Sequence, residues 1–119
     1  MGVLFTDVAR FDAWLEVEVL AVEAWAAIGV VAPAVAEAVR VKRPIVDAAF
    51  VAAVDERERV TDHDVAAFVD VVQAAIGPPA GPWVHYGLTS SDVVDTALSA
   101  TLTAAAALYV IPAVVSNLH

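Results

Sequence analysis

The sequence predicts an all-α protein, and three observations carry this prediction. Apolar residues recur at spacings of three and four along most of the 119 residues, as they do on the buried face of a helix. No segment shows the strict alternation of apolar and polar residues that is typical of a half-buried strand. Prolines and glycines fall between the apolar segments, where they mark helix ends and turns. A chain of this length that is 61% apolar can fill one modest core.

Three helices are expected in the first half of the chain. The first covers residues 6–28, and Gly29 supplies its C-terminal stop. A second, short helix covers residues 33–40 and opens with a proline, while residues 45–59 predict a third helix that ends in a charged turn. The apolar stripe of the first helix is expected at Val8, Phe11, Leu15, Val19, Val22 and Ala26.

The fourth helix is expected to begin at Thr61, with Asp64 three residues later completing a variant capping box, and to run to about Ile76. Residues 77–82 hold three prolines and two glycines, so we predict an irregular connection that excludes helix. Residues 83–88 then form a short non-helical approach to the last helix. The buried stripe of the fourth helix is expected at Val65, Phe68, Val69, Val72 and Ile76.

The last helix is expected to begin at Thr89, again with an acid three residues later at Asp92, and to continue at least to Val110. Pro112 should then break or kink it. Residues 97–115 are uncharged and approach the length that spans a bilayer, but their hydroxyls, alanines and proline make them weakly hydrophobic. Because this helix is apolar or small on every face, we instead expect partners to enclose it in a larger bundle or an oligomer.

The charge balance limits the possible partners. Six basic and fifteen acidic residues give a net charge of −9, which repels nucleic acid and anionic membranes. The chain has no cysteine, so we expect neither a disulfide nor a thiolate metal site, and we take the cytoplasm as its compartment. The N-terminal stretch carries acids where a signal peptide needs a basic flank, so we predict no targeting segment.

The stretch "HYGLTSSD", residues 85–92, is the first candidate site. The opening N–H groups of a helix lack partners and carry partial positive charge, so they attract carboxylates and phosphates. The hydroxyls of Thr89, Ser90 and Ser91 add donors there, and Gly87 allows a close turn of the backbone beneath a ligand. The sequence therefore predicts a cradle for a small anion. In the simpler alternative, Thr89 only caps the helix and His85 is a surface residue.

His63 is the second candidate. It lies far around the helix from the expected stripe, so we predict that it is not a core residue. At the start of a helix the dipole favours the neutral imidazole, which can both donate and accept a proton. The alternative is a solvated surface histidine, with Asp62 and Asp64 as favourable partners of the dipole. No pair of histidines has the spacing of a helical zinc site, and no phosphate-loop or dinucleotide pattern occurs.

Three segments of the sequence resemble one enzyme family. "HYGLTSSDVVDTALS" resembles the second-region motif of adenylosuccinate lyase, a member of the fumarase/aspartase superfamily, and "TDHDVAAFV" resembles its first-region histidine motif. "FDAWLEVEVLAVEAWAAIGVV" is similar to the first long helix of these enzymes. The resemblance runs from about Leu4 to Leu108, and the three segments occur in the family's order.

This resemblance implies an N-terminal helical domain at residues 1–88, followed at residues 89–119 by the first part of a central helical bundle. It implies a β-elimination that releases fumarate from adenylosuccinate to give AMP, and from the related succinyl-carboxamide ribotide, without a metal or other cofactor. By position, His63 would contact the substrate near the reacting nitrogen and assist acid–base chemistry. The remaining implied substrate-binding residues are Asp64, His85, Tyr86, Thr89, Ser90, Ser91 and Asp92.

The resemblance also implies an incomplete catalytic set. The family's general-acid histidine and its mobile-loop serine lie in later regions, which this chain does not contain, so we expect the isolated chain to be inactive. The upstream Arg-Tyr pair that grips phosphate is also absent, and Asp62 stands where the family often has a basic residue. Family members assemble each site from three subunits of a tetramer. The alternative of another class is a non-catalytic helical module that self-associates through its last helix.

Overall fold

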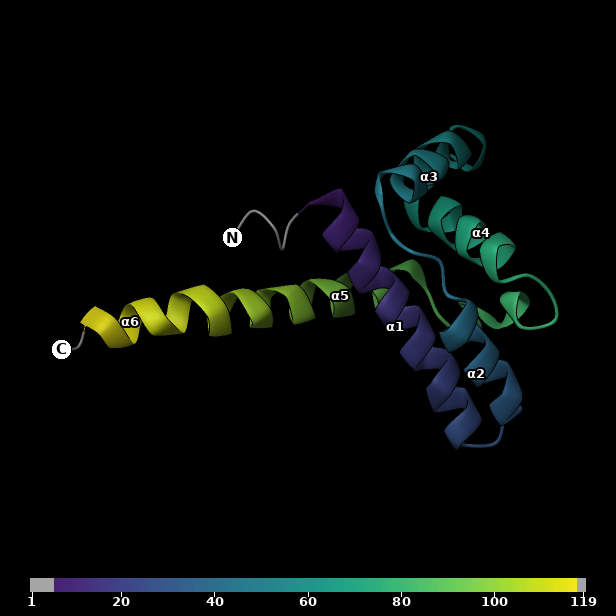
Figure 1. Cartoon of the computed structure of the whole chain (residues 1–119), viewed down its shortest axis with the longest axis horizontal. Coiled ribbons are helices and arrows are strands. Elements are labelled where there is room, and N and C mark those ends of the chain that lie inside the picture. Colours follow the sequence, from purple (N-terminus) through teal and green to yellow (C-terminus); the bar gives the residue numbers. More distant parts are fainter. Residues whose placement is uncertain (1–5, 118–119) are drawn as a thin grey trace.

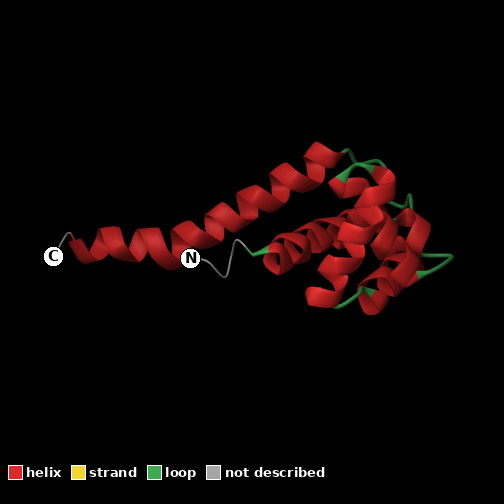
Figure 2. Ribbon diagram, turned by 90° about the horizontal axis from the view of Figure 1, so that it is seen from above, coloured by secondary structure: helices red, strands yellow, loops and turns green. Residues whose placement is uncertain are grey.

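The computed structural model describes residues 6–117, and all its regular elements are helices (Figure 2). The predicted all-α class is therefore confirmed, while Leu4 and the outermost ends of both implied domains lie outside the described residues. The elements are α1 (Asp7–Ala27), α2 (Pro33–Lys42), α3 (Ala48–Thr61), α4 (Asp64–Ile76), a 3₁₀ turn η2 (Gly81–Trp83), α5 (Ser90–Ala105), a π-helical segment η3 (Ala106–Val110) and α6 (Ile111–Asn117).

Helices α1 to α4 form a helical body, which we define as residues 7–76. Four aromatic rings, those of Phe11, Trp14, Phe50 and Phe68, stand at its centre, with centroid separations of 5.1–6.2 Å. Such edge-to-face and offset contacts add to the free energy gained by burying the rings. The predicted stripe of α4 is fully buried, and the stripe of α1 is buried from Phe11 to Val22. Val8 was wrongly included in the stripe: it lies in the first turn of α1, where it is exposed.

The ends of α1 follow the sequence closely. The Thr6 hydroxyl accepts a hydrogen bond from the Ala9 N–H, which caps the helix start. Gly29 has φ = +85°, the left-handed conformation that glycine adopts readily after a helix. The predicted stop at this glycine is therefore confirmed.

The start of α4 differs from the prediction. Thr61 is the last residue of α3 and not the cap of α4, because Asp62 adopts a left-handed conformation (φ = +53°) that ends α3 one residue later. The cap of α4 is His63, whose Nδ1 accepts a hydrogen bond from the Ala66 N–H at 3.2 Å. The Thr61 hydroxyl instead donates to the His63 carbonyl.

The connection between α4 and α5 is less irregular than predicted. The segment 77–82 was expected to exclude helix, yet the 3₁₀ turn Gly81–Trp83 begins inside it. Pro82 fits there because it occupies the first turn, where its missing N–H would have no helical partner. The turn is followed by further hydrogen-bonded turns at residues 84–87, which lead to Thr89.

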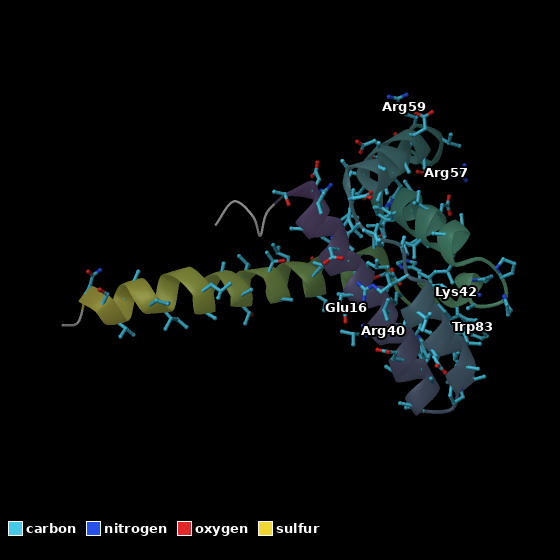
Figure 3. All side chains as sticks on the ribbon, in the orientation of Figure 1. Glu16, Arg40, Lys42, Arg57, Arg59 and Trp83 are labelled. Carbon is cyan, nitrogen blue, oxygen red and sulfur yellow. The ribbon has the colours of Figure 1, made fainter. Side chains whose placement is uncertain are left out.

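Helix α2 is attached to α1 by a cluster of ion pairs (Figure 3). Arg40 of α2 donates to Glu23 at 2.7 Å and to Glu16 at 3.3 Å, both on α1. Arg43, just past α2, also contacts Glu16. These arginines hold the pKa values of the two glutamates below their ordinary range, Arg43 having the largest effect on Glu16 and Arg40 on Glu23.

Helices α5 and α6 form a C-terminal rod, residues 90–117, that extends away from the helical body (Figure 1). The segment η3 joins them without a break, so Pro112 does not end the helix. A proline ring clashes with the carbonyl four residues earlier, and a π-helical turn just before it can relieve such a clash.

The rod is long and apolar enough to cross a membrane, and it is the one such helix among the described residues. Only 6% of its most apolar stretch is buried. The same length and composition fit a bundle helix that other chains would cover. Its exposed large side chains are Leu98, Leu102, Leu108, Ile111, Val114 and Val115.

Candidate functional site

The start of α5 has the cap that the sequence predicted. The Thr89 hydroxyl accepts from the Asp92 N–H at 3.4 Å, and the Asp92 carboxylate accepts from the Thr89 N–H at 2.8 Å. This reciprocal pair is a capping box, so these two side chains are engaged in holding the helix start. Ser91 is exposed and Ser90 is half-buried, and neither hydroxyl bonds to another described residue. The two serines are therefore the hydroxyls left for a ligand.

Ser90 lies beside a surface hollow of about 420 Å³. The hollow is bounded by α4 on one side and by the segment between η2 and α5 on the other. Its polar lining side chains come from both sides and are those of Asp70, Gln73, His85, Tyr86 and Ser90. The structure thus brings three of the predicted site residues to one place: His85, Tyr86 and Ser90.

His85 is more constrained than a free surface residue. Its side chain is 23% exposed, and its Nδ1 lies 2.6 Å from Oε1 of Glu18, which is 67 residues earlier on α1. Its backbone has φ = +70°, in the left-handed region that a residue other than glycine uncommonly adopts. The simpler interpretation of His85 as a surface residue therefore does not hold.

Glu18 was missed by the sequence analysis. It is completely buried, and its Oε2 has no hydrogen-bond partner among the described residues. Burial raises the pKa of its carboxyl group, and the hydrogen bond and charge of His85 oppose this rise. A signal was present in the sequence, because Glu18 stands three residues after Leu15 and four before Val22, on the buried stripe of α1.

Gly87 lies against the side chain of Trp25 and not beneath a ligand site. We expected it to allow a close turn beneath a ligand, but a Cβ at this position would meet the Trp25 ring at 2.8 Å. The Trp25 indole N–H also donates to the Tyr86 carbonyl at 3.0 Å. With φ = +72°, Gly87 lets the segment that carries His85 lie directly on α1.

His63 and Asp64 lie elsewhere. The His63 side chain is 51% exposed, which confirms that it is not a core residue, and its Nδ1 is occupied by the cap hydrogen bond. Asp64 lines a separate hollow of about 210 Å³, together with Arg10, Trp14 and Thr101. Neither residue borders the hollow of His85 and Ser90. Within one chain, the two predicted motifs therefore do not meet.

Across residues 6–117, no group of three or more histidine, aspartate or glutamate side chains is arranged to hold a metal ion. The polar chemistry of the hollow consists of hydroxyls, an amide, a carboxylate and an imidazole. Hydroxyl, amide and imidazolium groups are donors suited to an anion.

These features define an all-α protein with a candidate site of histidine and serine side chains where a long helix begins. No family model matches the chain. It is 50% identical to the adenylosuccinate lyase of Bacillus subtilis (strain 168) over 100 residues, which cover 83% of this chain and 22% of the relative. It is 46% identical to the adenylosuccinate lyase of Staphylococcus saprophyticus over 99 residues, with the same coverage.

The resemblance drawn from the three sequence segments is thus confirmed: the chain is a homologue of adenylosuccinate lyases, matching their N-terminal region. It spans about a fifth of the length of these curated relatives.

Proposed function

We propose that this chain is the N-terminal portion of an adenylosuccinate lyase, which cleaves adenylosuccinate to AMP and fumarate, and the succinyl-carboxamide ribotide in the same way. The observation that carries the proposal is the hollow lined by His85, Tyr86 and Ser90 at the start of α5. The identity to lyases over 83% of the chain supports it. We also propose a cytoplasmic location, which fits the absence of cysteine.

The proposed reaction needs fixed hydrogen-bond donors. In a β-elimination, a base removes a proton from the carbon beside one succinyl carboxylate, and the electron pair expels the nitrogen on the next carbon. Negative charge builds on that carboxylate before the C–N bond breaks, so donors that are already oriented lower the barrier. Ser90 and Ser91 fit this task, because the capping box engages Thr89 and Asp92 and leaves the two serine hydroxyls available.

The remaining predicted residues require more than one chain. His63 and Asp64 do not border the hollow of Ser90, so they serve a site that another copy completes. His85 and Tyr86 would line the nucleotide part of the substrate site. The proposal therefore includes a homo-oligomer, a tetramer in the complete enzyme, that covers the apolar rod.

Titration calorimetry of the isolated chain with fumarate, AMP and adenylosuccinate tests this function. We expect weak binding that falls at least tenfold in Ser90→Ala, because a hydroxyl donor is lost at the hollow. Ser99→Ala, an exposed serine further along α5, is the matched control and should leave binding unchanged. Binding that Ser90→Ala and His85→Ala do not affect would contradict the site. Release of fumarate, followed by its absorbance, would contradict the incompleteness of the catalytic set.

A second candidate function is a self-association module without a ligand, and the exposed rod favours it. Sedimentation of the chain should then show oligomers that dissociate in Leu102→Glu, because a charge disrupts an apolar contact. Val41→Glu, at an exposed valine of α2, is the control. Association with no response to any of the three ligands would favour the module. Partition of the chain into detergent micelles would instead favour a membrane helix.

A further inference from the structure

We propose that Glu18 is a positioning residue for His85: its buried carboxylate accepts a hydrogen bond from Nδ1, which leaves Nε2 as the nitrogen that meets an anionic group in the hollow. Only the identity of that anion rests on the proposed function. The pairing of the two side chains stands on the geometry alone.

The contact with Glu18 holds the His85 imidazole on its α1 side. Oε1 of Glu18 lies 2.6 Å from Nδ1, and the carboxylate is buried completely within α1's packed face. The ring itself borders the hollow beside Ser90. Because Nδ1 is engaged by α1, a molecule in the hollow can use only Nε2.

The backbone of His85 is held from the same side. Its left-handed conformation persists only when the surroundings determine it. Two neighbours provide this constraint, since the Tyr86 carbonyl accepts from Trp25 and Gly87 lies against the Trp25 ring. Helix α1 thus fixes the backbone through Trp25 and the side chain through Glu18.

Glu18 is poorly explained as a stabilising residue. Burying a carboxylate is costly, and the cost is repaid only when both oxygens are well paired. Here Oε2 has no partner among the described residues. An apolar side chain would suit the position between Leu15 and Val22 better. Packing therefore does not explain why residue 18 is a glutamate, whereas a role in orienting His85 at the hollow does.

The charge of Glu18 also suits an anion site. A carboxylate that accepts from Nδ1 leaves Nε2 as the free ring nitrogen, and an Nε2–H can donate to a phosphate or carboxylate. Asp70 is the other acid that borders the hollow, and it is paired with Arg57 at 2.8 Å. No described base other than His85 borders this hollow.

Nitrogen NMR of the ¹⁵N-labelled chain at neutral pH tests the pairing directly, because two-bond ¹⁵N–¹H correlations show which imidazole nitrogen carries a proton. The chain has three histidines, and His85→Asn assigns the signal. We expect a proton on Nδ1 of His85 in the unaltered chain. In Glu18→Leu the ring should change to the form with the proton on Nε2 alone. Glu18→Gln should restore the Nδ1 proton, because its amide carbonyl can still accept the bond.

Two acids provide matched controls. Glu16→Gln changes a glutamate on the same helix that contacts arginines, and Asp70→Asn changes the other acid of the hollow. Both should leave the His85 signals unchanged. An Nδ1 without a proton in the unaltered chain would overturn the proposal, even if Glu18→Leu fails to fold. A folded Glu18→Leu with an unchanged His85 spectrum would overturn it as well.

AMP serves as the probe for the ligand. Its addition should shift the Nε2 signal of His85, and the Kd should rise at least tenfold in Glu18→Leu. An unchanged Kd in that variant would refute the positioning role. If AMP, fumarate and adenylosuccinate all fail to bind the unaltered chain, the proposed function fails, while the Nδ1 signal still decides the pairing with Glu18.

Discussion

The helical body and the C-terminal rod are both rich in apolar residues, yet their burial is opposite. In the helical body, Phe11, Leu15 and Phe68 are almost inaccessible. In the rod, Leu98 and Leu102 are each about half exposed (50% and 53%). Val93 and Ala97 of α5, which packs against α1, are buried, while the rod as a whole extends away from the helical body (Figure 1).

This difference shows that apolar composition does not by itself locate a core. Each helix of the body packs against a neighbour within the chain, whereas the buried residues of the rod are limited to Val93, Ala97 and Ala105 of α5. A helix that is apolar on all sides needs packing partners on all sides to be buried. The candidate site lies where the two regions join: one wall is the packed helix α4, and the other is the segment between η2 and α5, which leads to Ser90, the first residue of the rod.

The largest expected effect is on the free energy of unfolding, when the same leucine-to-alanine substitution is made in each of the two regions. Leu15→Ala should lower the free energy of unfolding by about 2–5 kcal/mol, because it leaves a cavity in a packed core. Leu102→Ala should change it by less than about 0.5 kcal/mol in a monomeric chain, since this side chain contacts little. Urea unfolding followed by circular dichroism measures both.

Protein concentration sharpens this test. If the chain associates through the rod, the cost of Leu102→Ala should grow with concentration, while that of Leu15→Ala should not. Equal costs for the two variants at low concentration would show that the rod folds back onto the helical body in solution. That result would contradict the contrast between the regions.

Periodicity predicted the body well because burial there follows from the chain's own pattern. The stripe of α4, the stop at Gly29 and the capping box at Thr89 all depend on residues within a few positions of one another. The exposure of the rod was also foreseeable, since the preceding helices are too short to surround it. The resemblance to lyases was visible in motifs of the same local kind, and the 50% identity over 100 residues supports it.

Contacts across the chain were not predictable in this way. The meeting of Glu18 with His85 joins residues 67 positions apart, and the spacing around Glu18 shows a buried acid without naming its partner. Gly87 was assigned to a ligand because its neighbour Trp25 is distant in sequence. The start of α4 was misplaced for another reason. Asp62 adopts a left-handed conformation that ends α3, and the helix propensity of aspartate does not predict where such a conformation occurs.

An intermediate effect on stability is expected where the segment 85–87 packs against α1 of the helical body. Gly87→Ala combines a left-handed backbone with a Cβ only 2.8 Å from Trp25, so we expect a loss of about 1–3 kcal/mol in unfolding free energy. Gly29→Ala has a similar backbone but open space, and should cost only about 1 kcal/mol. Tryptophan fluorescence during urea unfolding would report both.

The Gly87 variant also tests how the two regions are joined. Because the segment carries His85, its displacement should alter the imidazole signals of His85, which Gly29→Ala should leave unchanged. Identical stabilities of the two variants would mean that the segment moves freely and that α1 does not constrain it.

The smallest effect concerns the ion pairs between α1 and α2. The pKa values of Glu16 and Glu23 are lowered from 4.5 in the folded chain, so their contribution to stability is present above pH 4.5 and is lost as the pH falls through the folded values. Glu18 acts in the opposite sense, because its raised pKa favours the protonated form on folding.

Arg40→Met should therefore flatten the fall in stability below pH 4.5, chiefly through Glu23, whose largest partner it removes. The side chains are more than a third exposed, so solvent screens them and the change should lie near the limit of urea unfolding. Salt at about 1 M, where the screening length is about 3 Å, should remove the difference between the variant and the unaltered chain. Arg59→Met, at an exposed pair within α3, is the matched control. A pH profile that Arg40→Met leaves unchanged would show that the ion pairs of Arg40 do not contribute to holding α2 on α1.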